Sequence, residues 1–175
     1  MTTRSLLALA ALALTVSACG SDGPTGNDGG GNGSFTGTIS GDISMSVTGE
    51  AMFGTSATNN SFGFVLGNDD AGIIFGRETT GLLGVGTHTV YDLVNGDEAD
   101  APASQLVGVI GITSGGTDHI CFAQGGTVTV TSSTASRMTG SLNVTAECLA
   151  GEGQPPRAVT IAGTFTAIGG PASFR

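Results

Sequence analysis

The chain has 175 residues and a formal net charge of −9, with 14 acidic side chains against five arginines and no lysine. This balance argues against nucleic acid as a partner, because neutralising phosphates requires a basic patch and the arginines are scattered. Direct adhesion to an anionic membrane surface is disfavoured for the same reason.

The N-terminal segment predicts an export signal. Arg4 precedes an apolar run from Leu6 to Val16 that contains no acidic residue, which is typical of the h-region of a signal peptide. A transmembrane helix needs about 20 apolar residues, so this run is too short to span a bilayer. We therefore expect residues 1–18 to be a helical signal peptide that is removed on export.

The end of the apolar run resembles the lipobox of bacterial lipoproteins. Val16-Ser17-Ala18-Cys19 places a branched apolar residue and two small residues before a cysteine. The resemblance implies cleavage before Cys19 and acylation of this residue, with fatty acids such as palmitate anchoring the chain in a lipid bilayer. It favours the outer membrane, since Gly20 stands where an inner-membrane retention signal has Asp. The alternative is an ordinary cleaved signal with an incidental Cys19.

The segment after the lipobox predicts a tether. Ser21 to Ser34 has the sequence SDGPTGNDGGGNGS, which contains no apolar side chain to bury, and it is expected to remain disordered. Residues 35–175 have the size of a single domain. The expected organisation is a signal peptide at 1–18, a lipidated cysteine with a flexible linker at 19–34, and one domain at 35–175, in the periplasm or at the cell surface.

The predicted domain opens with a period-two pattern. Phe35, Ile39, Ile43 and Val47 share one face, and hydroxyl side chains dominate the other. This alternation predicts one long half-buried strand over 35–48, ended by a break at Gly49-Glu50. A second strand is expected over 51–55.

Short strands bounded by turn residues follow, as in an antiparallel meander. Strands are predicted at 62–66, 72–77 and 87–91, with turns at 59–60 and 68–70 and an acidic surface loop at 95–102. Residues 105–113 are apolar at both parities, which predicts a central strand covered on both faces. A short buried helix is the alternative there, because periodicity alone does not separate the two.

The C-terminal third predicts four further strands, at 119–124, 126–133, 137–149 and 157–168, with a loop at 151–156. No segment has a clear helical period, so the fold class is all-β, either an antiparallel β-sandwich or a small lipocalin-like β-barrel with glycine-rich strands. Three similar hexads start at Phe35, Met138 and Ile161, each with glycine at its third position on the apolar face. Such glycines permit sharp coiling and close approach of strands, so the first strand is expected to close against the last. Chance repetition in a chain with 31 glycines is the competing interpretation.

Two cysteines lie within the predicted domain. Cys121 and Cys148 are expected to form a disulfide, because exported proteins fold in an oxidising compartment. A metal site would need further ligands at suitable spacing, and the chain has only His88 and His119. No cofactor is predicted.

Two weak candidates for chemistry remain. Asp118-His119 is the only adjacent acid and imidazole pair, placed just before a predicted strand, but neighbours on a strand point apart and no G-x-S-x-G elbow is present. Weak calcium candidates are the acidic residues of two predicted loops, Asp69, Asp70, Asp97 and Asp100. Neither loop matches an EF-hand, and solvated turns are the favoured interpretation.

The expected function is a non-enzymatic structural or binding module at the cell envelope, acting on an unknown envelope protein or small ligand. One alternative is a lipocalin-like carrier of a small apolar ligand, with several of the eight phenylalanines lining a cavity instead of packing a core. Another alternative is a hydrolase using His119. An enclosed apolar cavity would favour the carrier, a cleft converging on His119 would favour the hydrolase, and a filled core would favour the module.

Overall fold

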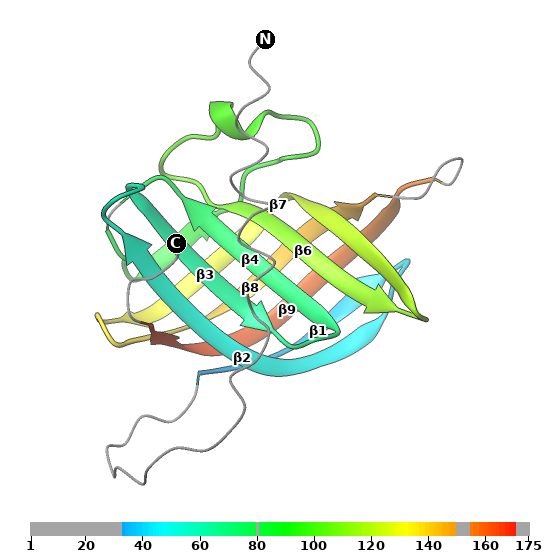
Figure 1. Ribbon diagram of the computed structural model, residues 1–175, viewed down its shortest axis with the longest axis horizontal. Coiled ribbons are helices and arrows are strands. Elements are labelled where there is room, and N and C mark those ends of the chain that lie inside the picture. Colours follow the sequence, from blue (N-terminus) through cyan, green and yellow to red (C-terminus); the bar gives the residue numbers. More distant parts are fainter. Residues whose placement is uncertain (1–32, 80, 150–154, 171–175) are drawn as a thin grey trace, which may run out of the picture.

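The computed structural model describes residues 33–79, 81–149 and 155–170, and these residues form an all-β structure (Figure 1). The strands are β1 (Ser34–Gly41), β2 (Met45–Ser56), β3 (Ser61–Gly67), β4 (Ala71–Arg77), β5 (Gly86–Thr89), β6 (Val107–Ser114), β7 (Thr117–Ser133), β8 (Arg137–Cys148) and β9 (Arg157–Gly169). A 3-10 turn, η1 (Glu98–Asp100), lies between β5 and β6. Within the described ranges, no helix is long and apolar enough to cross a membrane. The predicted signal helix, Cys19 and tether residues 19–32 lie outside these ranges.

Eight of the strands close into a barrel. The sheet runs β5-β7-β6-β4-β3-β2-β1-β9-β8, and β8 pairs back onto β7 to complete the ring. Successive strands around the ring are antiparallel, and a short parallel pairing of β2 with β9 seals the wall beside the start of β1. Of the two predicted all-β architectures, the barrel is therefore the one adopted. Ring closure leaves few unpaired strand edges.

The two ends of the barrel differ in what they carry. One end, which we call the near end, holds the start of β1, the end of β9 and the β2–β3 and β7–β8 turns. The opposite, far end carries the connections at 42–44, 68–70 and 115–116. The β6–β7 turn at the far end has positive φ at both Gly115 and Gly116, which suits a two-residue hairpin of type I′.

β5 continues the barrel wall beyond β6. The first part of β7 pairs with β6, from Thr117 to Phe122, and a later part pairs with β5, from Thr127 to Val130. The segment between β5 and β6 leaves and rejoins the wall at adjacent points, because Val90 and Leu106 form a parallel bridge. This segment lies at the near end and includes η1.

The predicted length of the first strand was wrong. Instead of one strand over 35–48 and a break at Gly49-Glu50, the chain turns at 42–44 and β2 runs unbroken through Gly49. Gly41 has a φ of +116°, and the turn has three residues. An odd number of connecting residues leaves the alternation in phase, so Ile43 within the turn is buried and the period-two pattern does not reveal the reversal.

Two further predictions need correction. The segments predicted as separate strands at 119–124 and 126–133 are one strand, β7, because the register shift between Ala123 and Gly125 is a bulge against β8 rather than a turn. The segment 105–113 forms a strand, as expected, but it is not covered on both faces. Ile110 and Ile112 are buried inside the barrel, whereas Gly111 is exposed on its outer face.

The hexad glycines lie where phenylalanine rings cross the wall. Gly37 of β1 pairs with Gly163 of β9, which confirms that the first strand closes against the last. The Phe35 ring covers both: a Cβ built on either glycine would lie 2.7 Å from a ring carbon. Gly140 of β8 pairs with Phe165, whose ring would approach a Cβ there equally closely. Glycine at these positions lets aromatic rings lie flat against the curved wall.

Side chains pack the inside of the barrel. Six of the eight phenylalanines point inward and are at most 4% exposed, namely Phe35, Phe53, Phe62, Phe64, Phe75 and Phe165. Phe64 lies at the centre of this packing, edge to face with Phe165 at 4.7 Å between ring centroids and 6.2 Å from Phe75. These residues form a continuous apolar core with aliphatic side chains from every strand of the ring.

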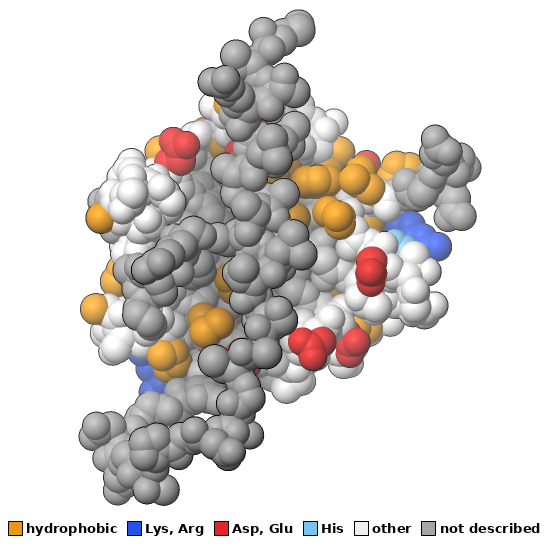
Figure 2. Space-filling model, in the orientation of Figure 1, with side chains coloured by type: hydrophobic (Ala, Val, Ile, Leu, Met, Phe, Trp, Pro, Cys, Tyr) orange, Lys and Arg blue, Asp and Glu red, His pale blue; other side chains and the backbone are white. Residues whose placement is uncertain are grey.

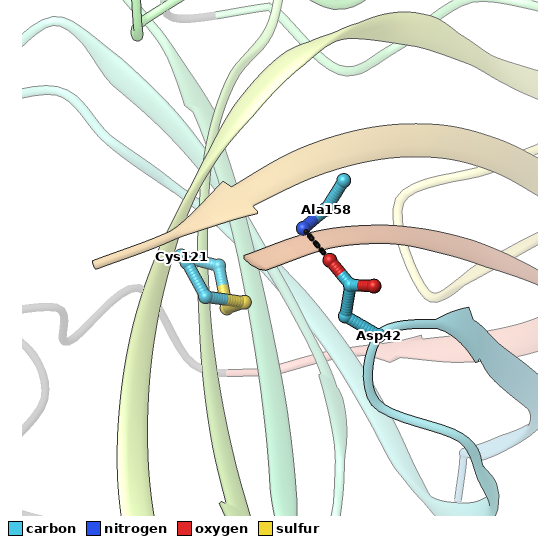
Figure 3. Close-up of a disulfide and its surroundings, with 4 residues drawn as sticks. Asp42, Cys121 and Ala158 are labelled. Carbon is cyan, nitrogen blue, oxygen red and sulfur yellow. Dashed lines mark hydrogen bonds between the residues drawn. A yellow bond between two sulfur atoms is a disulfide. The ribbon is translucent and has the colours of Figure 1, made fainter. Parts of the chain in front are cut away.

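The predicted disulfide is present. Cys121 of β7 and Cys148 of β8 are directly opposed in the sheet, buried and bonded (Figure 3). Figure 3 also shows the nearby start of β9, where the Asp42 carboxylate accepts a hydrogen bond from the Ala158 amide at 2.9 Å. The disulfide joins β7 to β8, and the hydrogen bond joins the β1–β2 turn to β9.

Candidate functional site

The two residues of the candidate catalytic pair face opposite sides of the strand on which they lie. Asp118 and His119 lie within β7, not before a strand as predicted. His119 is 9% exposed and faces inward beside Ile112, whereas Asp118 is exposed and accepts a hydrogen bond from the Thr113 hydroxyl at 2.8 Å. The alternation of the strand therefore points the imidazole and the carboxylate to opposite faces of the barrel wall.

The weak calcium candidates lie at opposite ends of the barrel. Asp69 and Asp70 belong to the far-end turn between β3 and β4, in which the Asn68 carboxamide accepts hydrogen bonds from the amides of Asp70 and Ala71. At the near end, Asp97 precedes η1 and Asp100 is its last residue. The Asp97 carboxylate caps the turn by accepting a hydrogen bond from the Ala99 amide. Among the residues that the structure describes, no three metal-ligating side chains converge.

Polar and charged side chains of the β4–β5 and β5–β6 connections make local contacts at the near end. Hydrogen bonds from the Asn95 side chain and backbone lower the pKa of Asp92. Burial raises the pKa of Glu98, and repulsion from Asp97 and Glu78 adds to this effect. Burial lowers the pKa of Arg77, whose guanidinium donates to the Leu82 carbonyl at 3.3 Å and has its Nε buried without a partner.

The outer face of the barrel carries an apolar row that sequence reasoning missed. The row consists of five outward-facing residues on adjacent strands, paired in register: Met52, Val65, Ile74, Val109 and Phe122. Their inward neighbours on the same strands are buried in the core, so alternation directs these five side chains to the outside. Ile120, two residues before Phe122 on β7, extends this apolar surface and is 55% exposed.

Glycines flank the apolar row and flatten the wall around it. On the far-end side, Gly67, Gly72 and Gly111 are paired in register across β3, β4 and β6, and on the near-end side Gly63 pairs with Gly76. A Cβ built on Gly72 or Gly111 would meet no atom within 4 Å. We call the outward faces of β3, β4 and β6, with Met52 and Phe122 at their margins, the smooth wall.

The opposite side of the barrel has a different chemistry. Outward positions of β1, β8 and β9 are mainly hydroxyl or amide side chains, namely Thr36, Thr38, Ser40, Thr139, Ser141, Asn143, Thr145, Thr160, Thr164 and Thr166. Every outward position of β3, β4 and β6, all of them described in the structure, is uncharged, and most are glycine or aliphatic. The smooth wall is therefore a distinct surface and not the average exterior of the barrel.

Acidic side chains border the smooth wall. Glu50 pairs with Gly67 at one margin, and Glu147 lies opposite Phe122 at the other. The far-end margin carries Asp69, Asp70 and Asp118, all exposed. Figure 2 shows acidic side chains near the β3–β4 turn and apolar side chains along β7. We refer to these five residues as the acidic rim.

A sequence signal for the smooth wall was present. Residues 63–67 and 72–76 share a glycine, apolar, aliphatic, apolar, glycine pattern, GFVLG and GIIFG. Which parity faces the core cannot be decided within either segment, since both parities are free of charge. Comparisons with family models, curated proteins and solved structures returned no match to this chain.

Proposed function

We propose that this chain is a bacterial lipoprotein whose barrel is a non-enzymatic binding module, held at the outer membrane through acylated Cys19. The lipobox sequence 16–19 and the apolar run before it support the anchor. The first strand begins at Ser34, which leaves a glycine-rich linker with a root-mean-square reach of about 20 Å between the lipid and the barrel.

The packing of the barrel interior supports the binding module most directly. Inward phenylalanines meet at the centre of the barrel, as the contact of Phe64 with Phe165 illustrates. An eight-stranded barrel is just wide enough for its own side chains to fill. We therefore assign binding to the exterior. The apolar side chains of the smooth wall face outward and are not part of the barrel core.

Substituting Cys19 tests the anchor. We expect the wild-type chain to incorporate a palmitate analogue in living bacteria and to fractionate with the outer membrane. Cys19→Ser removes the thiol that is acylated and should abolish labelling. Cys121→Ser/Cys148→Ser is the matched control, because it alters the other two cysteines and should leave labelling intact. Label-free wild-type protein in the soluble fraction would exclude the anchor.

The carrier is the second candidate, because small closed barrels of this size also hold apolar ligands. The aromatic packing argues against it. We expect native mass spectrometry of the exported Cys19→Ser chain, purified without detergent, to show the mass of the polypeptide alone. A stoichiometric apolar molecule that is released on unfolding would support the carrier and exclude a filled barrel. The hydrolase alternative gains nothing from the positions of Asp118 and His119, which face opposite sides of the wall.

A further inference from the structure

We propose that the smooth wall docks a short basic amphipathic segment of a partner protein, with apolar side chains on one face and Lys or Arg beside them. This inference rests on the proposed binding function and names the class of partner. The apolar row and the flanking glycines supply the contact surface, and the acidic rim selects the charge of the occupant.

The apolar row offers a flat surface against which a partner can pack. Neighbouring strands are about 4.8 Å apart, so five strands carry the row over roughly 20 Å. The in-register glycines on either side leave shallow troughs along the row, because they place no side chain above the sheet. Apolar side chains of a partner can pack into these troughs on both sides of Ile74.

The acidic rim disfavours two other occupants. If the same wall of a second copy docked here, carboxylates of one acidic rim would face carboxylates of the other, and like charges at an interface are repulsive. A stable dimer also buries about 800 Å² on each partner, whereas the apolar row and its troughs cover an area roughly 20 Å by 15 Å. An anionic membrane surface is repelled by the same carboxylates.

The described arginines do not neutralise the rim. Arg137 faces outward at the first residue of β8, opposite Ile168 at the near end, whereas the rim residue Glu147 lies at the other end of the same strand. Arg77 and Arg157 occupy inward positions of their strands, opposite Phe62 and Cys148. A basic partner therefore meets uncompensated carboxylates at three margins of an uncharged centre, which favours it electrostatically and fixes its orientation.

The test uses the exported Cys19→Ser chain, so its result does not depend on the lipid anchor. The probe is a fluorescein-labelled amphipathic peptide of 14 leucines and lysines, and fluorescence anisotropy measures its affinity. We expect a dissociation constant below about 100 µM, weakening with added salt because the rim is exposed. The same peptide with glutamate in place of each lysine should not bind.

Paired substitutions locate the binding. Ile74→Thr/Val109→Thr replaces two directly paired members of the row with another β-branched residue, and binding should weaken at least about tenfold, equivalent to 1.4 kcal/mol. The control is Thr145→Val/Thr160→Ile, which makes the opposite change on a directly paired position of β8 and β9 and should leave binding unchanged. Glu50→Gln/Asp70→Asn keeps the row and should weaken binding several-fold, which tests the rim even if the row variant folds poorly.

Several outcomes would overturn the docking proposal. These are no binding of the basic peptide, equal binding of both peptides, or an affinity that none of the wall and rim variants changes. Dimerisation in sedimentation experiments that Ile74→Thr/Val109→Thr abolishes would make the wall a self-interface instead. Binding to phosphatidylcholine vesicles that requires the row would assign it to lipid. Each leaves the anchoring result with Cys19→Ser unaffected, so failure of docking and failure of the proposed lipoprotein are distinguishable.

Discussion

Gly163→Ala is expected to destabilise the barrel by about 3 kcal/mol, the upper part of the range for overpacking a close-packed site. A Cβ at this position would lie 2.7 Å from both the Phe35 ring and the Thr36 carbonyl oxygen, and 2.8 Å from the Cα of Gly37. Two of these three atoms belong to the backbone of β1, so a side-chain rotation does not relieve the overlap. Either β1 moves away from β9 or the ring closure is strained.

Gly111→Ala is the matched control for this prediction. Gly111 is also a strand glycine, but a Cβ there meets nothing within 4 Å. We expect its stability to stay within about 0.5 kcal/mol of wild type, because the reduced freedom of the unfolded chain offsets small native-state costs. Urea unfolding followed by circular dichroism measures both variants. Equal stabilities for the two variants would show that the contact between Phe35 and the paired glycines does not hold the barrel closed.

Removing the disulfide is expected to cost about 3–4 kcal/mol. The bond links residues 27 apart, and the chain-entropy model assigns a stabilisation of that size to a loop of this length. Alanine is preferred to serine in the double variant Cys121→Ala/Cys148→Ala, because both positions are fully buried and a serine hydroxyl would have no partner there. The midpoint of urea unfolding should fall while the slope changes little.

A reduced sample of the wild-type chain serves as the control for the double variant. Its unfolding midpoint should fall by a similar amount, because reduction removes the same cross-link without altering the side chains. If the reduced and oxidised proteins unfold at the same urea concentration, the cross-strand pairing of β7 with β8 alone sets the stability of this region, and the prediction is wrong.

Much of the barrel was predictable from period-two patterns, and the errors have physical causes. Alternation shows which residues share a face, so the inward set that includes Phe35 and Val47 was identified correctly. It does not show where the chain reverses when the connection has an odd number of residues, as at 42–44. It also does not distinguish a bulge from a turn, and for that reason β7 was predicted as two strands.

The pairing of distant strands was only partly accessible. The hexad glycines indicated that the first and last strands meet, because a glycine on an apolar face needs a close neighbour, and Gly37 and Gly163 are indeed paired. Nothing in the segment after Gly126 indicates that β5 pairs with it. The smooth wall was missed for a related reason: it exists only once β3, β4 and β6 are aligned in register, which no single segment encodes.

The bridge between Val90 and Leu106 has a consequence for how this protein can vary. Backbone hydrogen bonds join Tyr91 to Leu106 and Leu106 to Thr89, so the segment that includes η1 departs and returns through one narrow neck. The entropic cost of closing a loop grows slowly with its length. Because both ends of this segment are fixed to the sheet at neighbouring residues, changes in its length need not alter the strand pairing. Residues 94–105, which lie beyond a further backbone hydrogen bond from the Leu93 amide to the Ala123 carbonyl oxygen of β7, can thus be shortened, lengthened or exchanged for another peptide while the barrel keeps its shape.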